Sequence, residues 1–232
     1  MDRGLFIFMI DGLLTNGLIQ GMIALASDML VVRFEFSESQ AGTFAMLPYF
    51  VFALTIPIVV GYVESLGNRM HLIFLMGILN MSAFSIWTVL PPCYQCWWSI
   101  MPLILLGVSL SIYITIMQCS IPFVIKSHLL GTALGLQGVF QNFGLMLFTF
   151  VFSYIHDNTL TVSQGYFWSI VFFLLMSIVS FLTKCVLHAW DLKRGSILNS
   201  KTPYLDFLQY SQIHPLQHRC LDEEQEDYRA IP

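Results

Sequence analysis

The feature that most limits the fold of this chain is a long stretch with almost no charge. The 145 residues from Ser39 to Thr183 carry four formal charges, those of Glu64, Arg69, Lys126 and Asp157. Of all 232 residues, 10% are charged and 56% are hydrophobic, and the mean hydropathy is +0.73. Soluble domains carry about 25% charged residues. We therefore expect a lipid bilayer, and not water, to surround most of the chain.

Polar, proline-bearing and glycine-bearing breaks divide the chain into six apolar segments, each long enough to cross a bilayer as a helix. These segments are about 5–28, 41–63, 70–90, 98–122, 131–155 and 164–187. Asp11 and Asn16 interrupt the first segment, so we expect it to be a retained span and not a signal peptide. The predicted fold class is an all-α polytopic membrane protein with six transmembrane helices.

Charge predicts how these spans are oriented. If both ends are cytosolic, the cytosolic side receives Arg3, Arg69, Lys126, Lys184, Lys193 and Arg194, and the other side receives only Arg33. This bias follows the positive-inside rule and requires an even number of spans. We expect residues 1–190 to form the membrane domain. Residues 191–232, which hold 12 of the 24 charges, are expected to form a polar cytosolic tail.

Polar side chains within the spans are candidates for a substrate cavity, because such side chains usually face other helices or water. They are Asp11, Asn16, Gln20, Tyr113, Gln118, Gln137 and Gln141. Two interpretations of Asp11 stay open: a functional intramembrane carboxylate, or a residue near the interface. The glycines of the fifth span, including Gly131-x-x-x-Gly135, predict close helix packing.

The stretch "GYVESLGNR" between the second and third spans predicts a tight cytosolic turn in which Glu64 and Arg69 can pair. An ordinary positive-inside loop is the alternative. The stretch resembles the loop motif of the major facilitator superfamily, G-x-x-x-D-R-x-G-R-R. The resemblance implies a cytosolic gate loop of Gly61, Glu64, Gly67 and Arg69. The first glycine is displaced by one residue, glutamate replaces aspartate, and Ser65 replaces the first arginine.

Longer stretches are similar to the lysosomal dipeptide transporter branch of that superfamily. They include residues 26–49 and 105–157, with "LLGTALGLQ" (129–137) and "QNFGL" (141–145). The resemblance covers about residues 5–190 and implies helices seven to twelve, the C-terminal half of a twelve-helix transporter. It also implies alternating access, with a dipeptide or another small solute as substrate. Ion coupling and uniport are both open.

A single half leaves its cavity face without a partner in the same chain, because the substrate of such transporters lies between two halves. Three arrangements are open: a fragment of a longer transporter, a symmetric pair of two copies, and a half without transport activity that acts as a membrane scaffold. In the first two arrangements, Asp11 is expected to face the amine of a peptide substrate. No basic residue of the spans is expected to face the carboxylate of that substrate. No enzyme activity, cofactor, metal or nucleic acid is expected.

Two smaller signals concern the compartment. Cys93 and Cys96 lie on the expected non-cytosolic side, where a disulfide and free thiols are both open. In the tail, Tyr210 to Ile213 fits a tyrosine-based sorting signal, which agrees with delivery to endosomes and lysosomes.

Overall fold

The computed structural model describes residues 3–66, 69–124, 130–159 and 162–193, and all of its regular structure is helical. The elements are α1 (Arg3–Phe34), α2 (Glu38–Ala45), α3 (Leu47–Leu66), α4 (Arg69–Val89), the 3-10 helix η1 (Trp97–Ile100), α5 (Met101–Val124), α6 (Leu130–Asp157) and α7 (Val162–Lys193). Within the described part, six segments are long and apolar enough to cross a membrane. The predicted fold class is confirmed.

The first and last helices extend beyond the predicted spans, and each buries a cation that has oxygen partners inside the fold. Helix α1 continues to Phe34 although Arg33 was expected to stand at the far interface. Arg33 is buried, and its Nη2 donates to the carbonyls of Trp87 at 3.3 Å and Leu90 at 2.8 Å. These carbonyls lie at the end of α4, where helix carbonyls lack partners and attract a cation. Arg33 therefore joins α1 to α4.

The second predicted span is two helices, α2 and α3, separated at Met46. Pro48 follows directly, and it has no N–H for the carbonyl of a preceding turn. The same lack of an N–H is harmless in the first turn of a new helix, which α3 begins at Leu47. Pro57 lies within α3 itself.

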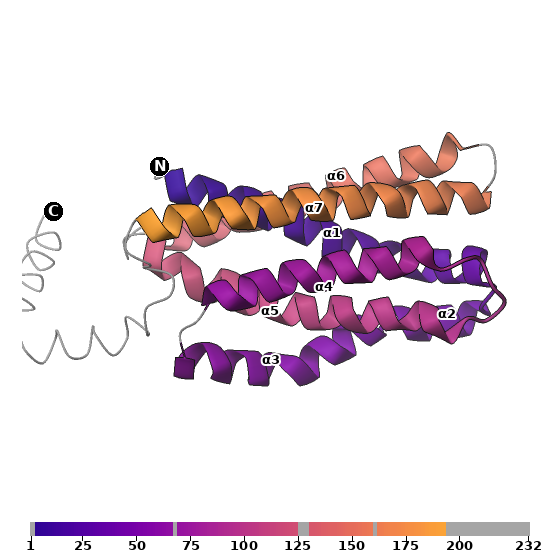
Figure 1. The fold of residues 1–232 in the computed structure, drawn as a ribbon, viewed down its shortest axis with the longest axis horizontal. Helices are drawn as coiled ribbons and strands as arrows, with labels where there is room; N and C mark the ends of the chain where they lie inside the picture. The colour runs from indigo at the N-terminus through magenta and orange to yellow at the C-terminus, as the bar shows by residue number, and fades with distance from the viewer. Residues whose placement is uncertain (1–2, 67–68, 125–129, 160–161, 194–232) are drawn as a thin grey trace, which may run out of the picture.

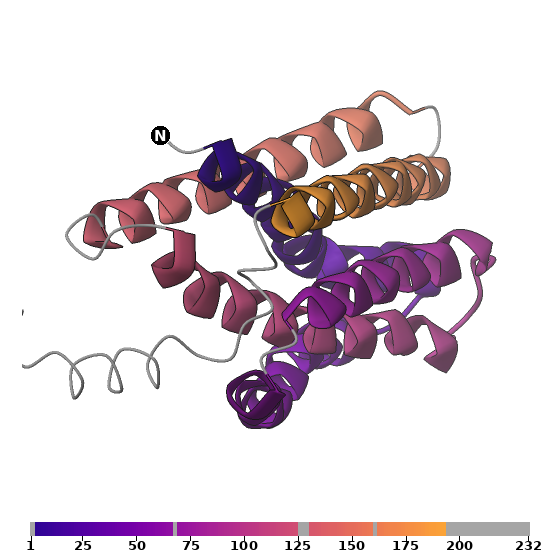
Figure 2. The same cartoon turned by 60° about the vertical axis from the view of Figure 1, so that its left-hand side comes forward.

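The helices form an elongated bundle with an ordered series of neighbours (Figure 1). Helix α1 packs between α6 and α7, α4 packs between α5 and α7, and α3 packs on α5. Helices α6 and α3 stand at the two ends of this series and occupy opposite edges of the molecule in Figure 2. The start of α1 and the end of α7 lie at the same end of the bundle, as an even number of spans requires (Figure 1).

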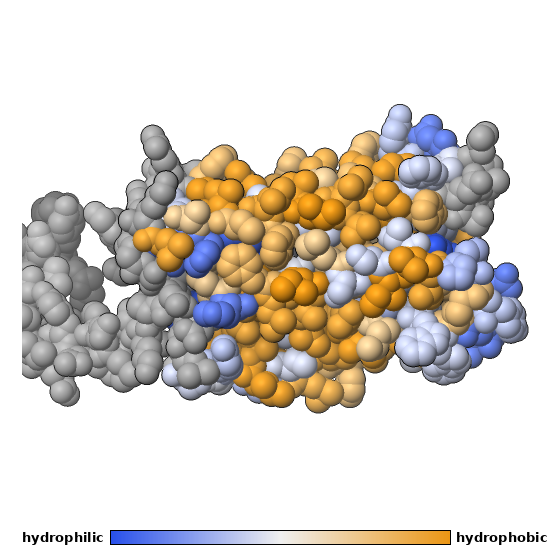
Figure 3. Space-filling view, in the orientation of Figure 1, coloured by the Kyte–Doolittle hydropathy of each residue, from blue (hydrophilic) through white to orange (hydrophobic). Residues whose placement is uncertain are grey.

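The outer surface carries a broad hydrophobic belt between more polar ends (Figure 3). Burial within this belt is uneven. In their most apolar windows, 67% of α1 residues and 72% of α5 residues are buried, compared with 17% for α6 and 6% for the α2–α3 segment. The helices at the ends of the series are therefore the ones that this chain covers least.

Close helix packing occurs at a different glycine of α6 from those in the predicted motif. A Cβ on Gly144 would lie 2.3 Å from the carbonyl oxygen of Leu13, so no larger residue fits there between α6 and α1. A Cβ on Gly131, Gly135 or Gly138 would meet no atom within 4 Å. The Gly131-x-x-x-Gly135 motif therefore packs against no described residue of this chain.

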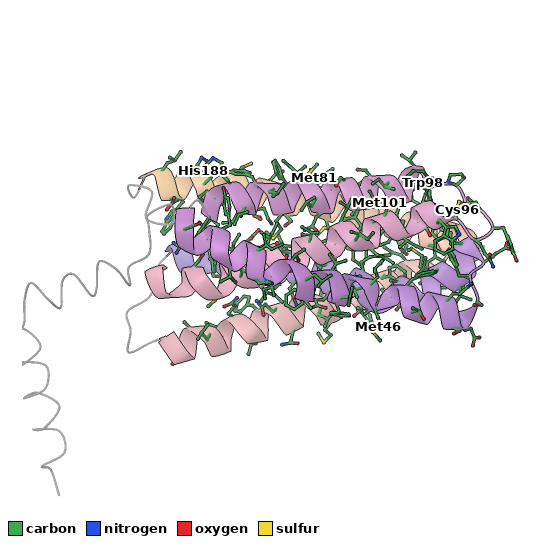
Figure 4. All side chains as sticks on the ribbon, turned by 90° about the horizontal axis from the view of Figure 1, so that it is seen from below. Met46, Met81, Cys96, Trp98, Met101 and His188 are labelled. Atoms are coloured by element: carbon green, nitrogen blue, oxygen red, sulfur yellow. A yellow bond between two sulfur atoms is a disulfide. The ribbon has the colours of Figure 1, made fainter. Side chains whose placement is uncertain are left out.

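The connection between α4 and α5 is closed by a disulfide between Cys93 and Cys96, which decides between the two alternatives left open by the sequence. Cys96 and Trp98 lie at the end of the bundle opposite to His188 of α7 (Figure 4). Between the two cysteines, Gln95 has a positive φ of 48°, and its backbone N–H donates to the carbonyl of Phe34 at 2.9 Å. The closed loop thereby contacts the end of α1.

Candidate functional site

The polar residues of α1 lie on two different flanks of the helix. Asp11 and Thr15 are one turn apart and share one flank, which faces α7. Asn16 and Gln20 are also one turn apart, and with Gly12 they face α5, α6 and α3. The sequence does not distinguish these flanks, because each follows the same helical spacing.

The flank toward α7 holds a buried ion pair. Lys184 Nζ lies 2.8 Å from Asp11 Oδ1, and the side chains are 1% and 2% exposed. The same ammonium donates at 2.8 Å to Thr15 Oγ1 and at 2.8 Å to Ser180 Oγ. Thr183 Oγ1 also donates to Asp11 Oδ1, at 3.0 Å. The three ammonium protons of Lys184 thus have three oxygen partners, and the two charges cancel within the pair.

The flank toward α5 and α6 carries no charge. The hydroxyl of Tyr113, on α5, donates to the carbonyl of Gly12 at 3.0 Å, and the Gln141 side chain lies beside this hydroxyl. Asn16 Nδ2 donates to the carbonyl of Gln141, on α6, at 2.9 Å. These bonds join the middle of α1 to both of the helices that flank it on this side.

Two further contacts extend the neutral flank. Toward the C-terminal end of α1, the hydroxyl of Tyr49, on α3, donates to Gln20 Oε1 at 3.1 Å. One turn before Gln141 on α6, Gln137 is 3% exposed, and neither its amide oxygen nor its amide nitrogen has a hydrogen-bond partner among the residues that the structure describes. A buried carboxamide without partners is costly, so this side chain needs an explanation that the fold alone does not supply.

Five of the seven predicted cavity residues thus lie on one flank of α1 or on the helices that this flank faces, Gln137 by its place one turn before Gln141 on α6. We name this group the neutral cluster; it consists of Asn16, Gln20, Tyr113, Gln137 and Gln141. Asp11 lies on the opposite flank. The side chain of Gln118, near the end of α5, falls outside the described residues.

The predicted gate loop is only partly described. Gly61 lies exposed on α3, and Arg69 is buried at the start of α4. Gly67 and the side chain of Glu64 fall outside the described residues, as do Tyr210 and Ile213 of the predicted sorting signal. The proposed pairing of Glu64 with Arg69 stays a prediction.

Sequence reasoning counted Lys184 among the cations at the cytosolic end of the last span. The structure instead buries Lys184 inside the bundle, because α7 continues to Lys193 and the ammonium binds Asp11. The expectation that no basic residue of the spans faces the carboxylate of a substrate stays a prediction. A signal for this pair existed. Asp11 is eight residues from the start of α1 at Arg3, and Lys184 is nine residues from the end of α7 at Lys193. With ~1.5 Å rise per residue, both lie at about the same depth from one end of the bundle.

The site offers hydrogen bonds and no metal-ligand set. Within residues 3–193, leaving aside the gaps in the described part, no three histidine, cysteine, aspartate or glutamate side chains gather as they would around a metal ion. The neutral cluster consists of side-chain amides and one phenol. These groups donate and accept hydrogen bonds and carry no charge.

Comparison with known proteins places this arrangement among membrane transporters. No protein-family profile matches the sequence. The chain is 24% identical over 189 residues to the lysosomal dipeptide transporter MFSD1 of Homo sapiens, which covers 82% of this chain and 38% of that protein. It is 27% identical over 182 residues to the lysosomal dipeptide transporter MFSD1 of Danio rerio, covering 76% of this chain and 36% of the relative. The chain thus spans less than half the length of the relatives it matches.

Among solved structures, the fold is similar to that of the xylose transporter XylE from E. coli in a partially occluded, inward-open conformation. The TM-score is 0.60 at 17% sequence identity, over 92% of this chain and 59% of the transporter. These relatives are transporters and not enzymes. The chain is a transporter-like, multi-pass membrane protein with six candidate spans in the major facilitator fold and with distant sequence similarity to that superfamily.

Proposed function

We propose that this chain is one half of a major facilitator transporter that carries dipeptides or similar small organic solutes by alternating access. The observation that carries the proposal is the neutral cluster, which is polar, uncharged and located on the flank of α1 that faces α3, α5 and α6. The helices at the ends of the neighbour series, α3 and α6, are the least covered by this chain. In this fold the substrate is held between two halves, near the midplane.

The half that this chain represents is proposed to be the C-terminal one, helices seven to twelve. Support comes from the resemblance of residues 105–157 to that half. In this assignment α1 and α5 line the cavity, while α2–α3 and α6 contact the opposite half, which is either an N-terminal half or a second copy. The exposed residues Phe50, Leu54, Ile58 and Tyr62 recur every four residues along α3 and give that contact one continuous apolar face.

The substrate class and the compartment are proposed from the relatives, which are named lysosomal dipeptide transporters. The amides of Gln137 and Gln141 and the hydroxyl of Tyr113 are suited to the peptide group of a dipeptide, which presents one N–H donor and one C=O acceptor. Gln118 is proposed to extend this wall. Delivery to endosomal and lysosomal membranes is proposed to use the tail signal at Tyr210 and Ile213, with both ends of the chain cytosolic.

The test is uptake of a radiolabelled dipeptide into proteoliposomes that contain the purified chain alone, or the chain together with an N-terminal half supplied by a relative. Uptake above that of empty liposomes, reduced at least tenfold by the double variant Gln137→Leu/Gln141→Leu, is the expected result. A matched control is Asn158→Leu, an exposed amide just after the end of α6 whose side chain donates to the carbonyl of Tyr154.

Two outcomes would contradict the proposal. Uptake of sugars or other solutes, but not of dipeptides, would support transport by this chain and reject dipeptides as its substrates. No uptake by either preparation, with retained binding of the chain to a partner transporter, would favour a membrane scaffold. Cross-linking in native membranes separates the two forms of partner, because a species of 26.5 kDa alone rejects a pair of copies.

A further inference from the structure

The buried pair of Asp11 and Lys184 has a role that differs from substrate binding. Lys184 uses all three of its protons on Asp11, Thr15 and Ser180, and Asp11 Oδ1 already accepts from Lys184 and from Thr183. The Asp11 side chain is 2% exposed, so a substrate amine could reach its carboxylate only by opening the contact between α1 and α7 and disturbing the pair with Lys184. Breaking a buried pair in this way is strongly unfavourable.

The hydrogen bonds of the pair point away from those of the neutral cluster, while the carboxylate of Asp11 still lies near enough to the Tyr113 hydroxyl to act on it electrostatically. Asp11 and Thr15 face α7, whereas Gly12 and Asn16 face α5 and α6. Next to the pair, part of the seam between α1 and α7 is apolar, and farther along the same seam Tyr166 of α7 donates to Asp28 of α1. An indentation of about 250 Å³ in the apolar part is lined by Ile7, Ile10, Val179, Leu182, Thr183 and Val186. The ion pair thus borders an apolar part of the contact between the two helices.

Helix α1 is therefore fixed on both flanks at the same level. One residue after Asp11, the carbonyl of Gly12 accepts the hydroxyl of Tyr113, which belongs to the neutral cluster. Any displacement of α1 along α7 would carry Gly12 with it and would move the acceptor of Tyr113. The contact between Asp11 and Lys184 thus sets the position of a residue in the neutral cluster without touching a solute.

We infer that Asp11 and Lys184 are positioning residues that fix the cytosolic half of α1 to α7, so that both helices move as one unit during transport, and that neither residue binds the substrate amine. This inference rests on the proposed function for its transport readout. The sequence predicts that Asp11 faces the substrate amine. The inference instead gives Asp11 a positioning role, in which it holds α1 and thereby the carbonyl that accepts the hydroxyl of Tyr113.

The experiment compares a dipeptide that has a free amine with its N-acetylated analogue in proteoliposomes. Variants are Asp11→Asn, Lys184→Met and the neutral pair Asp11→Leu/Lys184→Met. We expect each single variant to reduce the maximal rate at least tenfold for both solutes, with KM and the preference between the solutes unchanged. The neutral pair should recover most of the rate, because it leaves no unpaired charge. The control is Asp28→Asn on the same helix, which keeps an oxygen acceptor for the hydroxyl of Tyr166.

The inference is overturned if Asp11→Asn raises KM for the free-amine dipeptide and abolishes the preference over its N-acetylated analogue. It is also overturned if the neutral pair is no more active than the single variants. Thermal unfolding in detergent gives a second readout that needs no transport. We expect both single variants to unfold at a lower temperature than the neutral pair. Equal unfolding midpoints for all three variants would reject the positioning role of Asp11 and Lys184. A protein that shows the expected order of unfolding temperatures but transports neither solute would reject the proposed substrate class, and the positioning role of Asp11 and Lys184 would stand.

Discussion

The two flanks of α1 handle polar groups in opposite ways. On the flank toward α7, two full charges are buried, paired and supplied with hydroxyl partners. On the flank toward α5 and α6, the groups are neutral, and the amide of Gln137 is left without partners. A fold can retain an unsatisfied buried group where function requires it, and it rarely leaves a buried charge unpaired. The difference fits the proposal that the charged flank holds the helices together while the neutral flank meets the solute.

The largest expected effect comes from removing the cation on the charged flank. Lys184→Met leaves the carboxylate of Asp11 buried without its countercharge, and breaking such a pair costs about 3–5 kcal/mol. We expect this loss in the free energy of unfolding, measured by SDS titration in mixed micelles. The variant Asp11→Leu/Lys184→Met should recover most of that loss. If Lys184→Met unfolds like the unmodified protein, the flanks do not differ as described.

On the neutral flank the sign is expected to reverse. Gln137→Leu replaces a buried amide that lacks partners with an apolar side chain of similar size, which should stabilise the fold by about 1–3 kcal/mol. The same change should lower dipeptide uptake, because it removes a hydrogen-bonding group of the neutral cluster. The two measurements are the SDS titration and proteoliposome uptake. A variant that is both destabilised and fully active would show that Gln137 belongs to the packing and not to the site.

A smaller effect is expected at the bond between α5 and α1. Tyr113→Phe removes the hydroxyl that donates to the carbonyl of Gly12 and should cost about 1 kcal/mol of stability. Uptake should fall by a larger factor than stability predicts, because this hydroxyl borders the neutral cluster. Measuring both quantities on one preparation distinguishes the contributions. An equal loss in uptake for Tyr113→Phe and for a control of matched stability, such as Ser109→Ala, which removes the bond from α5 to Asn80, would assign Tyr113 to packing alone.

The smallest effect on the fold is expected at the open glycines of α6. Gly135→Leu adds a side chain where a Cβ meets no atom within 4 Å, so the unfolding of this chain should change by less than about 0.5 kcal/mol. Gly144→Leu is the matched control, because it forces α6 away from Leu13 and should unfold the domain. If the open face contacts a second half, Gly135→Leu will abolish that association in a pull-down while leaving the chain folded. Intact association would place the partner elsewhere.

The sequence predicts the number of spans and identifies the polar residues within them, but it does not predict how each helix is rotated. Length and hydropathy identify six spans because about 20 apolar residues are needed to cross a bilayer. Rotation is harder to predict, because lipid and protein interior are both apolar and no face of α6 stands out by composition. For that reason the glycine motif at Gly131 and Gly135 predicts packing, while Gly144 makes the contact.

The ends of the helices are predicted incorrectly for a related reason. A charge near the end of an apolar run is normally taken as an interface, yet Arg33 and Lys184 are both buried by partners far away in the sequence. The partners of Arg33 are main-chain carbonyls, which no residue pattern identifies. The partner of Lys184 is a side chain, so the equal depths of Asp11 and Lys184 along α1 and α7 carry a usable signal once both helices are drawn at full length.

The exposed thiol of Cys185 directly follows Lys184 on α7. Cys93 and Cys96 form a disulfide, so neither has a free thiol that could react with a maleimide probe unless the disulfide is reduced. Replacing Cys119 and Cys220 with serine would leave Cys185 as the single reactive sulfur of the chain. A fluorophore or spin label attached at that native position would report directly on motion at the α1–α7 seam, without any cysteine having to be engineered into the membrane domain.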